Sequence, residues 1–219
     1  SNGNERVDNY FWMRLSDDQK NAETPDSQTV KVLAYLNAEN DYADAVMKHT
    51  EAFQATLFEE LKGRIKEDDE TVPFLDNGYW YHTKYFPGKE YPVTYRRKDG
   101  TETPEVMLDV NLLAEGHDFT SVGGSSVSPD NNLMAYGVDH VSRRQYTMYV
   151  KDLNTGQLLP DEIANTTGQG VWAADNKTLY YVKKDPETLR AAVIMKHVLG
   201  TPVSEDKVVY DETDETFSV

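Results

Sequence analysis

Apolar side chains recur at intervals of three or four between residues 28 and 66, which is the spacing of one face of a helix. The first stripe comprises Val32, Leu36, Ala43, Val46 and Met47. A second stripe follows Thr50, a residue type suited to a helix N-cap, and comprises Phe53, Leu57, Leu61 and Ile65. The spacing predicts two amphipathic helices whose apolar faces need a covering surface, on each other or on the sheets that follow.

An aromatic cluster interrupts the polar stretch that precedes these helices. Tyr10, Phe11 and Trp12 are adjacent in a segment of about 25 otherwise polar residues. Three neighbouring aromatic rings are too apolar for a free tail, because each would expose a large hydrophobic surface. We therefore expect this cluster to dock on another element.

After Val72 the pattern changes to short runs rich in Tyr, Val and Thr, separated by Gly, Asp, Asn and Pro. The runs span residues 78–86, 91–97, 105–109, 133–139, 146–153, 158–163, 170–175, 178–185, 193–200 and 207–212. Short strands with no helix between them are joined by hairpins, so antiparallel sheets are expected.

An internal repeat organises these strands. A shift of 45 residues superposes Val127 on Trp172, Asp130 on Asp175, Met134 on Leu179, Tyr136 on Tyr181, Met148 on Val193, Tyr149 on Ile194 and Leu153 on Val198, without a gap. Four strands in this length are typical of one β-propeller blade. A two-sheet sandwich is the alternative, but it does not predict a gapless repeat.

The predicted fold is mainly β: a partial β-propeller of about three four-stranded antiparallel blades, preceded by an N-terminal α-helical segment. We place the extended and helical segment at residues 1–70 and the first blades at residues 71–219. Closed propellers have four to eight blades, so the chain is expected to be the front part of a longer protein. Unpaired edge strands would then favour self-association.

Composition narrows the classes of function. The chain has 22 Lys and Arg against 38 Asp and Glu, a formal net charge of −16, which argues against nucleic-acid binding. The charge permits basic peptides as partners, but a soluble acidic surface is the favoured interpretation. The absence of cysteine excludes disulfides and thiolate chemistry.

Two further observations concern the compartment. No run of 18 apolar residues is present, so no membrane span is predicted, and the localisation is expected to be cytoplasmic or periplasmic. The opening Ser1-Asn2-Gly3 resembles the remnant of a cleaved expression tag, so a native leader could have preceded it.

The segment SPDNNLMAYGVDH raises the question of a hydrolytic site, because it contains Ser128, Asp130 and His140. In the repeat, Ser128 is replaced by Ala173 whereas Asp130 is kept as Asp175. A hairpin turn explains this better than a nucleophile, because Asp and Asn cap their own backbone in turns. The nearby GGSSV also lacks the closing glycine of a nucleophile elbow.

No metal or cofactor site is predicted. His49, His82, His117, His140 and His197 have no metal-ligand spacing, and each is expected to be a hydrogen-bonded structural residue. The Asp68–Glu70 run lacks the spacing of a calcium loop and is expected to be a solvated linker. Arg143 and Arg144 form a basic spot that suits either an interdomain contact or a solvated hairpin tip.

An ordered series of segments resembles the N-terminal part of oligopeptidase B-type enzymes of the prolyl oligopeptidase family of serine peptidases. The series begins with DNYFWMRL and includes GKEYPVTYRR and VWAADNKTLYYVKKD; its segments are residues 8–15, 32–47, 60–73, 88–97, 105–116, 125–156, 171–185 and 197–219. Each segment is modest alone, but together they cover nearly the whole chain in order.

The resemblance implies a two-domain enzyme in which a seven-bladed propeller restricts a C-terminal α/β-hydrolase domain to short peptides, cleaved after Lys or Arg. The triad would lie in that hydrolase domain, so the resemblance places no catalytic, cofactor or metal residue in this chain. It also implies that the apolar helical faces pack on the hydrolase domain. A non-enzymatic propeller that binds partner proteins is the alternative.

Overall fold

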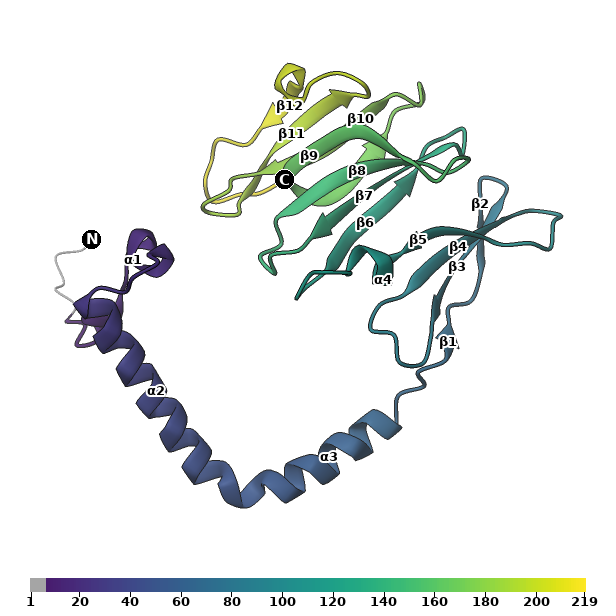
Figure 1. Ribbon diagram of the computed structural model, residues 1–219. Helices are drawn as coiled ribbons and strands as arrows, with labels where there is room; N and C mark the ends of the chain where they lie inside the picture. Colours follow the sequence, from purple (N-terminus) through teal and green to yellow (C-terminus); the bar gives the residue numbers. More distant parts are fainter. Residues whose placement is uncertain (1–6) are drawn as a thin grey trace. The chain divides into compact units, whose positions relative to one another are not determined.

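The computed structural model describes residues 7–219, so the Ser1-Asn2-Gly3 opening lies outside the described part (Figure 1). The chain forms two compact units, one ending at Lys66 and one spanning Glu67–Val219. The border therefore lies four residues before the one expected from the sequence. Strand β1 (Asp69–Glu70) pairs with the second unit, which corrects the expectation that this acidic run is only a solvated linker.

The first unit is helical. Its elements are η1 (Phe11–Met13), α1 (Asp17–Asn21), α2 (Ser27–Met47), η2 (Lys48–Thr50) and α3 (Glu51–Gly63). Asp26 caps α2 by accepting the Thr29 amide, and hydrogen bonds from Gln19 and Thr29 lower its pKa to about 2. The two expected amphipathic helices are thus present.

Trp12 of the aromatic cluster docks on α2, whereas Tyr10 and Phe11 are exposed, so the expected docking is confirmed for only one of the three rings. Trp12 meets Tyr35 edge-on with ring centroids 5.6 Å apart, and the Lys31 ammonium lies 4.8 Å from the Trp12 ring centroid. The expected cap at Thr50 is wrong in its chemistry, because this hydroxyl donates to the Met47 carbonyl at 2.6 Å instead of accepting an amide of α3.

The second unit is built of antiparallel strands. They are β1 (Asp69–Glu70), β2 (Phe74–Asp76), β3 (Tyr79–Tyr85), β4 (Val93–Lys98), β5 (Glu105–Asp109), β6 (Ser121–Val127), β7 (Leu133–Asp139), β8 (Tyr146–Asp152), β9 (Leu158–Trp172), β10 (Thr178–Lys184), β11 (Ala191–Val198) and β12 (Lys207–Asp211). Short helices α4 (Val110–Leu113) and η3 (Val203–Glu205) lie between them. Strands β1 and β2 both pair with β3, and β3, β4 and β5 follow in order.

The other strands form one seven-stranded sheet in the order β12-β11-β10-β9-β8-β7-β6. The long strand β9 joins two four-stranded sets, because its first part pairs with β8 and its last part with β10. We call β1–β5 blade 1, β6–β8 with the first part of β9 blade 2, and the last part of β9 with β10–β12 blade 3. The expected blades are therefore all present (Figure 1).

The 45-residue repeat is visible in backbone detail. Asn131 and Asn176 occupy equivalent turn positions with φ of 64° and 57°. The equivalence slips by one residue in the third strand, because Tyr136 pairs with Tyr149 whereas Tyr181 pairs with Met195. A bulge next to Lys184 adds one residue to β11, which a gapless sequence alignment could not reveal.

Two apolar cores lie between neighbouring blades. One joins blade 1 to blade 2 and contains Tyr81, Met107, Leu108, Val110, Met134, Tyr136 and Val138. The other joins blade 2 to blade 3 and contains Ala135, Met148, Val150, Ile163, Leu179, Tyr181 and Met195. No blade has a core of its own, so stacking of blades supplies the burial that stabilises the unit.

A glycine pair sets the spacing between β7 and the crossing point of β9. A Cβ added to Gly137 would lie 2.3 Å from the Cα of Gly168, which is a backbone atom that cannot rotate away.

Thermal unfolding should therefore show that Gly137→Ala is less stable than the unsubstituted chain by about 2–3 kcal/mol, as for other overpacked cores. Gly63→Ala is the control, because nothing lies within 4 Å of an added Cβ and alanine favours the helix. Equal stability of Gly137→Ala and the unsubstituted chain would contradict this packing.

Candidate interdomain surface

Ser128 is part of a hydrogen-bonded turn. Its hydroxyl donates to Asp130 at 2.6 Å and accepts the Leu133 amide at 2.9 Å, and the residue is 1% exposed. The bond from Ser128, with further bonds from Asn132, lowers the pKa of Asp130. The Oγ atom therefore closes the β6–β7 turn and does not face solvent.

His140 lies at the opposite end of β7 from Ser128. A seven-residue strand separates them, a span of about 20 Å, so the two side chains do not meet. The His140 Nδ1 atom is 3.0 Å from the Thr120 hydroxyl oxygen, and its ring stacks on His117 with centroids 3.6 Å apart. The three residues that suggested a triad are thus divided between a turn and a distant loop.

The repeated turn at Asp175 has the same chemistry without the serine. The Lys177 amide and the Thr178 hydroxyl and amide donate to this carboxylate and lower its pKa to about 2. The hydroxyl that Ser128 supplies in blade 2 is therefore replaced in blade 3 by that of Thr178. Turn closure therefore explains why the repeat keeps the aspartate but not the serine.

The remaining histidines also make structural contacts. His82 in β3 stacks on Tyr95 with centroids 5.1 Å apart, and the His49 Nδ1 atom lies 2.9 Å from the Val46 carbonyl oxygen. His197 in β11 is fully buried between Asp161 and Asp206. Within residues 7–219, no group of three or more His, Asp or Glu side chains is arranged to hold a metal ion.

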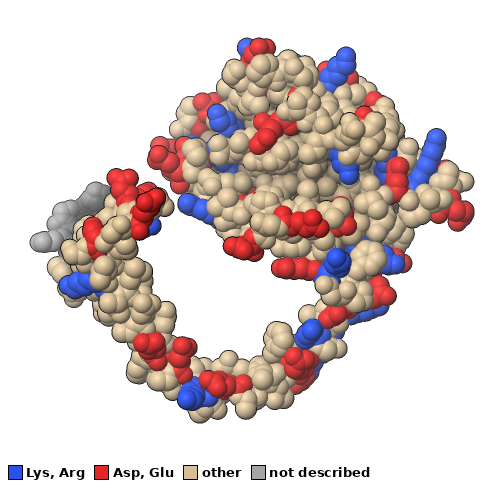
Figure 2. All heavy atoms as spheres, in the orientation of Figure 1, with Lys and Arg blue, Asp and Glu red and all other residues tan. Residues whose placement is uncertain are grey.

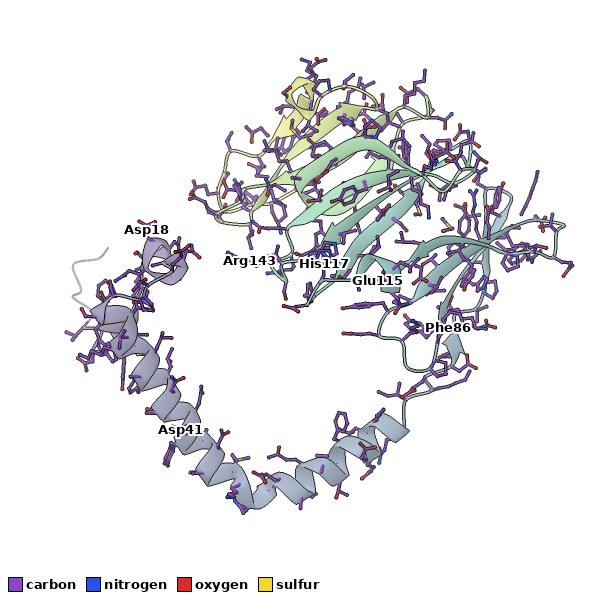
Figure 3. All side chains as sticks on the ribbon, in the orientation of Figure 1. Asp18, Asp41, Phe86, Glu115, His117 and Arg143 are labelled. Atoms are coloured by element: carbon purple, nitrogen blue, oxygen red, sulfur yellow. The ribbon has the colours of Figure 1, made fainter. Side chains whose placement is uncertain are left out.

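The basic spot lies at a rim of the second unit. Arg143 occupies the β7–β8 loop, beside the α4–β6 loop that carries Glu115 and His117 (Figure 3). The buried carboxylate of Asp139 shapes this loop by accepting the amides of Val141 and Arg144 at 2.8 and 2.6 Å. Among the residues that the structure describes, neither arginine forms a side-chain ion pair, so the tip is solvated and available to a partner.

Charge on the surface is mixed. On the face drawn in Figure 2, Lys and Arg lie singly among Asp and Glu and form no continuous basic surface. Nothing in this view offers the basic track that a nucleic-acid backbone needs. None of the helices in the described part is long and apolar enough to cross a membrane.

The largest unpartnered apolar feature is the surface of α2 and α3. Only Thr29 and Val32 of α2 are buried, and no residue of α3 is. The exposed apolar side chains of the two helices are Val30, Leu33, Leu36, Tyr42, Val46, Met47, Phe53, Leu57, Phe58 and Leu61. The helices do not cover each other, so their amphipathic pattern is explained only by a further surface.

The cavities of the blade unit, which the sequence did not predict, include two that lie along the blades. One of about 490 Å³ opens between blades 1 and 2 and is lined by Phe74, Asp76, Tyr81, His82, Thr83, Thr94, Met107, Ser125, Ser126 and Val127. Another of about 710 Å³ lies on blade 3, beside Arg190, Ala192, Val193 and Met195. Met195, which borders the second cavity, also belongs to the core between blades 2 and 3.

Comparison with known proteins gives a consistent match. A family model described as prolyl oligopeptidase, N-terminal beta-propeller domain, matches residues 1–219. Dipeptidyl aminopeptidase BI of Pseudoxanthomonas mexicana is 44% identical over 231 residues, which cover 98% of this chain and 31% of that protein. Protease 2 of Moraxella lacunata is 30% identical over 225 residues, covering 99% of this chain and 31% of that protein.

Solved structures match this chain as well. Oligopeptidase B from Leishmania major superposes with a TM-score of 0.85 and 34% identity, covering 97% of this chain and 29% of that one. This chain therefore spans about three tenths of the length of the relatives that it matches.

The turn role of Ser128 can be tested directly. Ser128→Ala removes a buried hydroxyl that makes two hydrogen bonds, so denaturant unfolding should show a loss of about 1–3 kcal/mol. Ser125→Ala, at an exposed serine of the preceding strand β6, is the control and should be neutral. A fluorophosphonate probe for activated serines should leave the chain unlabelled. Labelling at Ser128 would establish it as a nucleophile and overturn the turn assignment.

Proposed function

This chain belongs to the prolyl oligopeptidase family, whose N-terminal β-propeller domain it matches over residues 1–219, and we propose that it controls access of short peptides to a serine active site. The active site would lie in a C-terminal α/β-hydrolase domain outside these residues. There, a serine activated by a histidine would carry out acyl transfer to water. The role of this chain would be size exclusion and domain pairing.

The observation that carries this proposal is the uncovered apolar surface of α2 and α3. A folded protein seldom exposes so many large apolar side chains on two successive helices without a partner. The proposed partner is the hydrolase domain, on which residues 1–70 would pack. Burying one exposed Phe or Leu contributes about 1.5–3 kcal/mol, so a few such contacts would hold the domains together.

The propeller suits a gate because its blades enclose space without filling it. Stacked blades leave a passage along their inner strands, and in this chain those strands are β2, β6 and the last part of β9. Their exposed side chains include Phe74, Leu75 and Val171. A passage of this kind admits an extended peptide and excludes a folded protein.

Cleavage after Lys or Arg is proposed from the likeness to oligopeptidase B, and the acidic balance of the chain supports it. A net charge of −16 attracts cationic peptides over distances of about one Debye length. The greater identity to a dipeptidyl aminopeptidase favours a second specificity, removal of dipeptides from a free N-terminus.

Two substrates separate these specificities in the full-length enzyme. An N-blocked arginyl amide reports cleavage after a basic residue, whereas a dipeptidyl amide with a free α-amine reports dipeptide release. Higher kcat/KM on the blocked substrate is expected if Lys/Arg preference is correct. A requirement for the free amine would favour the second specificity, and no hydrolysis of either would favour a non-enzymatic scaffold.

Open sheet edges support self-association of the isolated chain. Strand β12 is exposed along its whole length at one end of the seven-stranded sheet. Sedimentation of the 219-residue chain should therefore show dimers or larger species that increase with concentration.

The proposed docking surface makes a prediction that differs between the chain and the full-length enzyme. Phe58 is 63% exposed in α3, so Phe58→Ser should leave unfolding of the 219-residue chain within about 0.5 kcal/mol. In the full-length enzyme the same change should cost about 2–4 kcal/mol and raise proteolytic cleavage between the domains. Glu59→Gln on the same helix is the control. Equal effects of Phe58→Ser in both proteins would contradict docking.

A further inference from the structure

His197 is the most deeply enclosed titratable side chain of the second unit. Its Nδ1 atom lies 2.7 Å from Asp206 Oδ1, and its Nε2 atom lies 3.0 Å from Asp161 Oδ1. The imidazole has no exposed surface, and each carboxylate side chain is 1% exposed. The sequence predicted a hydrogen-bonded structural histidine here, but gave no sign of two acidic partners.

The cluster joins two blades. Asp161 belongs to the part of β9 that lies in blade 2, whereas His197 and Asp206 belong to blade 3. Asp161 Oδ1 also accepts the Gly200 amide at 2.6 Å, and the Tyr181 hydroxyl donates to Asp206 Oδ2 at 2.8 Å. The outer strand of blade 2 is thereby tied to the β11–β12 connection of blade 3.

Few atoms of this cluster can donate a hydrogen bond. An ionised carboxylate only accepts hydrogen bonds, and a neutral imidazole has one N–H to donate. Both ring nitrogens face carboxyl oxygens, so two N–H groups are needed when both carboxyls are ionised. Asp161 Oδ2 is also buried without a hydrogen-bond partner among the described residues, which makes a nearby positive charge more valuable.

We propose that His197 is doubly protonated and acts as a cationic clamp between Asp161 and Asp206, which makes the seam between blades 2 and 3 sensitive to pH. Loss of one proton would leave two buried carboxylates facing a ring with a single N–H. The uncompensated charge then favours separation of the Asp161 strand from the Asp206 loop, because water can solvate the carboxylates. The seam would loosen at its outer rim.

The seam between blades 1 and 2 is built differently. There, the Arg96 guanidinium of blade 1 donates to the Asn131 carbonyl of blade 2 at 2.7 Å. Arginine stays charged at all physiological pH values, and a carbonyl does not titrate. The His197 cluster differs from this contact, because an imidazole can change its charge near neutrality.

The direction of the effect follows from proton linkage. The titratable groups in contact with the ring are Asp161 from β9 and Asp206 from the β11–β12 connection, with Tyr181 from β10 behind Asp206. A proton held more tightly in the folded state stabilises fully below about pH 6.5, the ordinary imidazole value, and less as pH rises. The clamp should therefore weaken as the pH rises.

The first experiment is NMR of the 219-residue chain with ¹⁵N-labelled histidine. At pH 7, both ring nitrogens of His197 should have the shifts of protonated nitrogens, and raising the pH should convert one of them. Asp161→Asn keeps an acceptor for Gly200 and removes one negative charge, so this conversion should move to lower pH. A singly protonated His197 at pH 6–7, or an unchanged conversion in Asp161→Asn, would overturn the proposal.

The second experiment compares thermal unfolding of His197→Gln and the unsubstituted chain from pH 6 to 9. Removing one partner of a buried charged cluster should lower Tm by roughly 10 °C at pH 6, with a smaller deficit at pH 9. His82→Gln is the matched control, because the His82 ring stacks on Tyr95 and takes no part in the cluster with Asp161 and Asp206. A His197→Gln deficit that is constant across this range would assign the residue a packing role alone. If that variant does not fold, the NMR comparison still decides whether His197 is doubly protonated.

Discussion

The fold depends on close stacking of one blade on the next, because neither hydrophobic core belongs to a single blade. At the seam between blades 2 and 3, the Ser126 hydroxyl donates to the Gly170 carbonyl at 2.7 Å, and the Trp172 indole donates to the Ser126 carbonyl at 3.0 Å. Side-chain bonds to backbone at this spacing require that the strands approach closely, which the Gly137–Gly168 contact permits. Strand β9 reinforces the seam covalently, since one continuous strand belongs to both blades.

Close stacking of the blades also explains why the polar hairpin turns resemble catalytic sites. Asp130 and Asp175 close equivalent hairpins through bonds to their own loops, and the side chains at these turns also reach the next blade. The Asp130 amide donates to Asn176 at 3.0 Å, and Asn77 donates to the Pro129 carbonyl at 2.8 Å. Polar residues gathered in this way serve stacking. A serine among them, such as Ser128, is therefore buried and hydrogen-bonded and lacks the exposure of a nucleophile.

The two units differ in how much of their own apolar surface they bury. The propeller unit buries two apolar clusters between its blades, whereas α2 and α3 leave most of their apolar residues exposed. In the function that we propose, the blades form the gate and the helices attach it to the hydrolase domain. The arginine tip at 143–144 is a further exposed polar feature of the propeller unit.

The sequence by itself determined the helices, the strands and the repeat, because helical periodicity, strand alternation and turn residues are local properties. It also identified the family, since short segments matched in order over nearly the whole chain. Tertiary structure decided what depends on distant partners. The bulge at β11, the pairing of Asp69 and Glu70 with β3, and the hydroxyl of Thr50 turning back to Met47 each follow from contacts that no local pattern encodes. Asp161, His197 and Asp206 meet only because β9 passes from one blade to the next, so their chemistry becomes visible only when the blades are stacked.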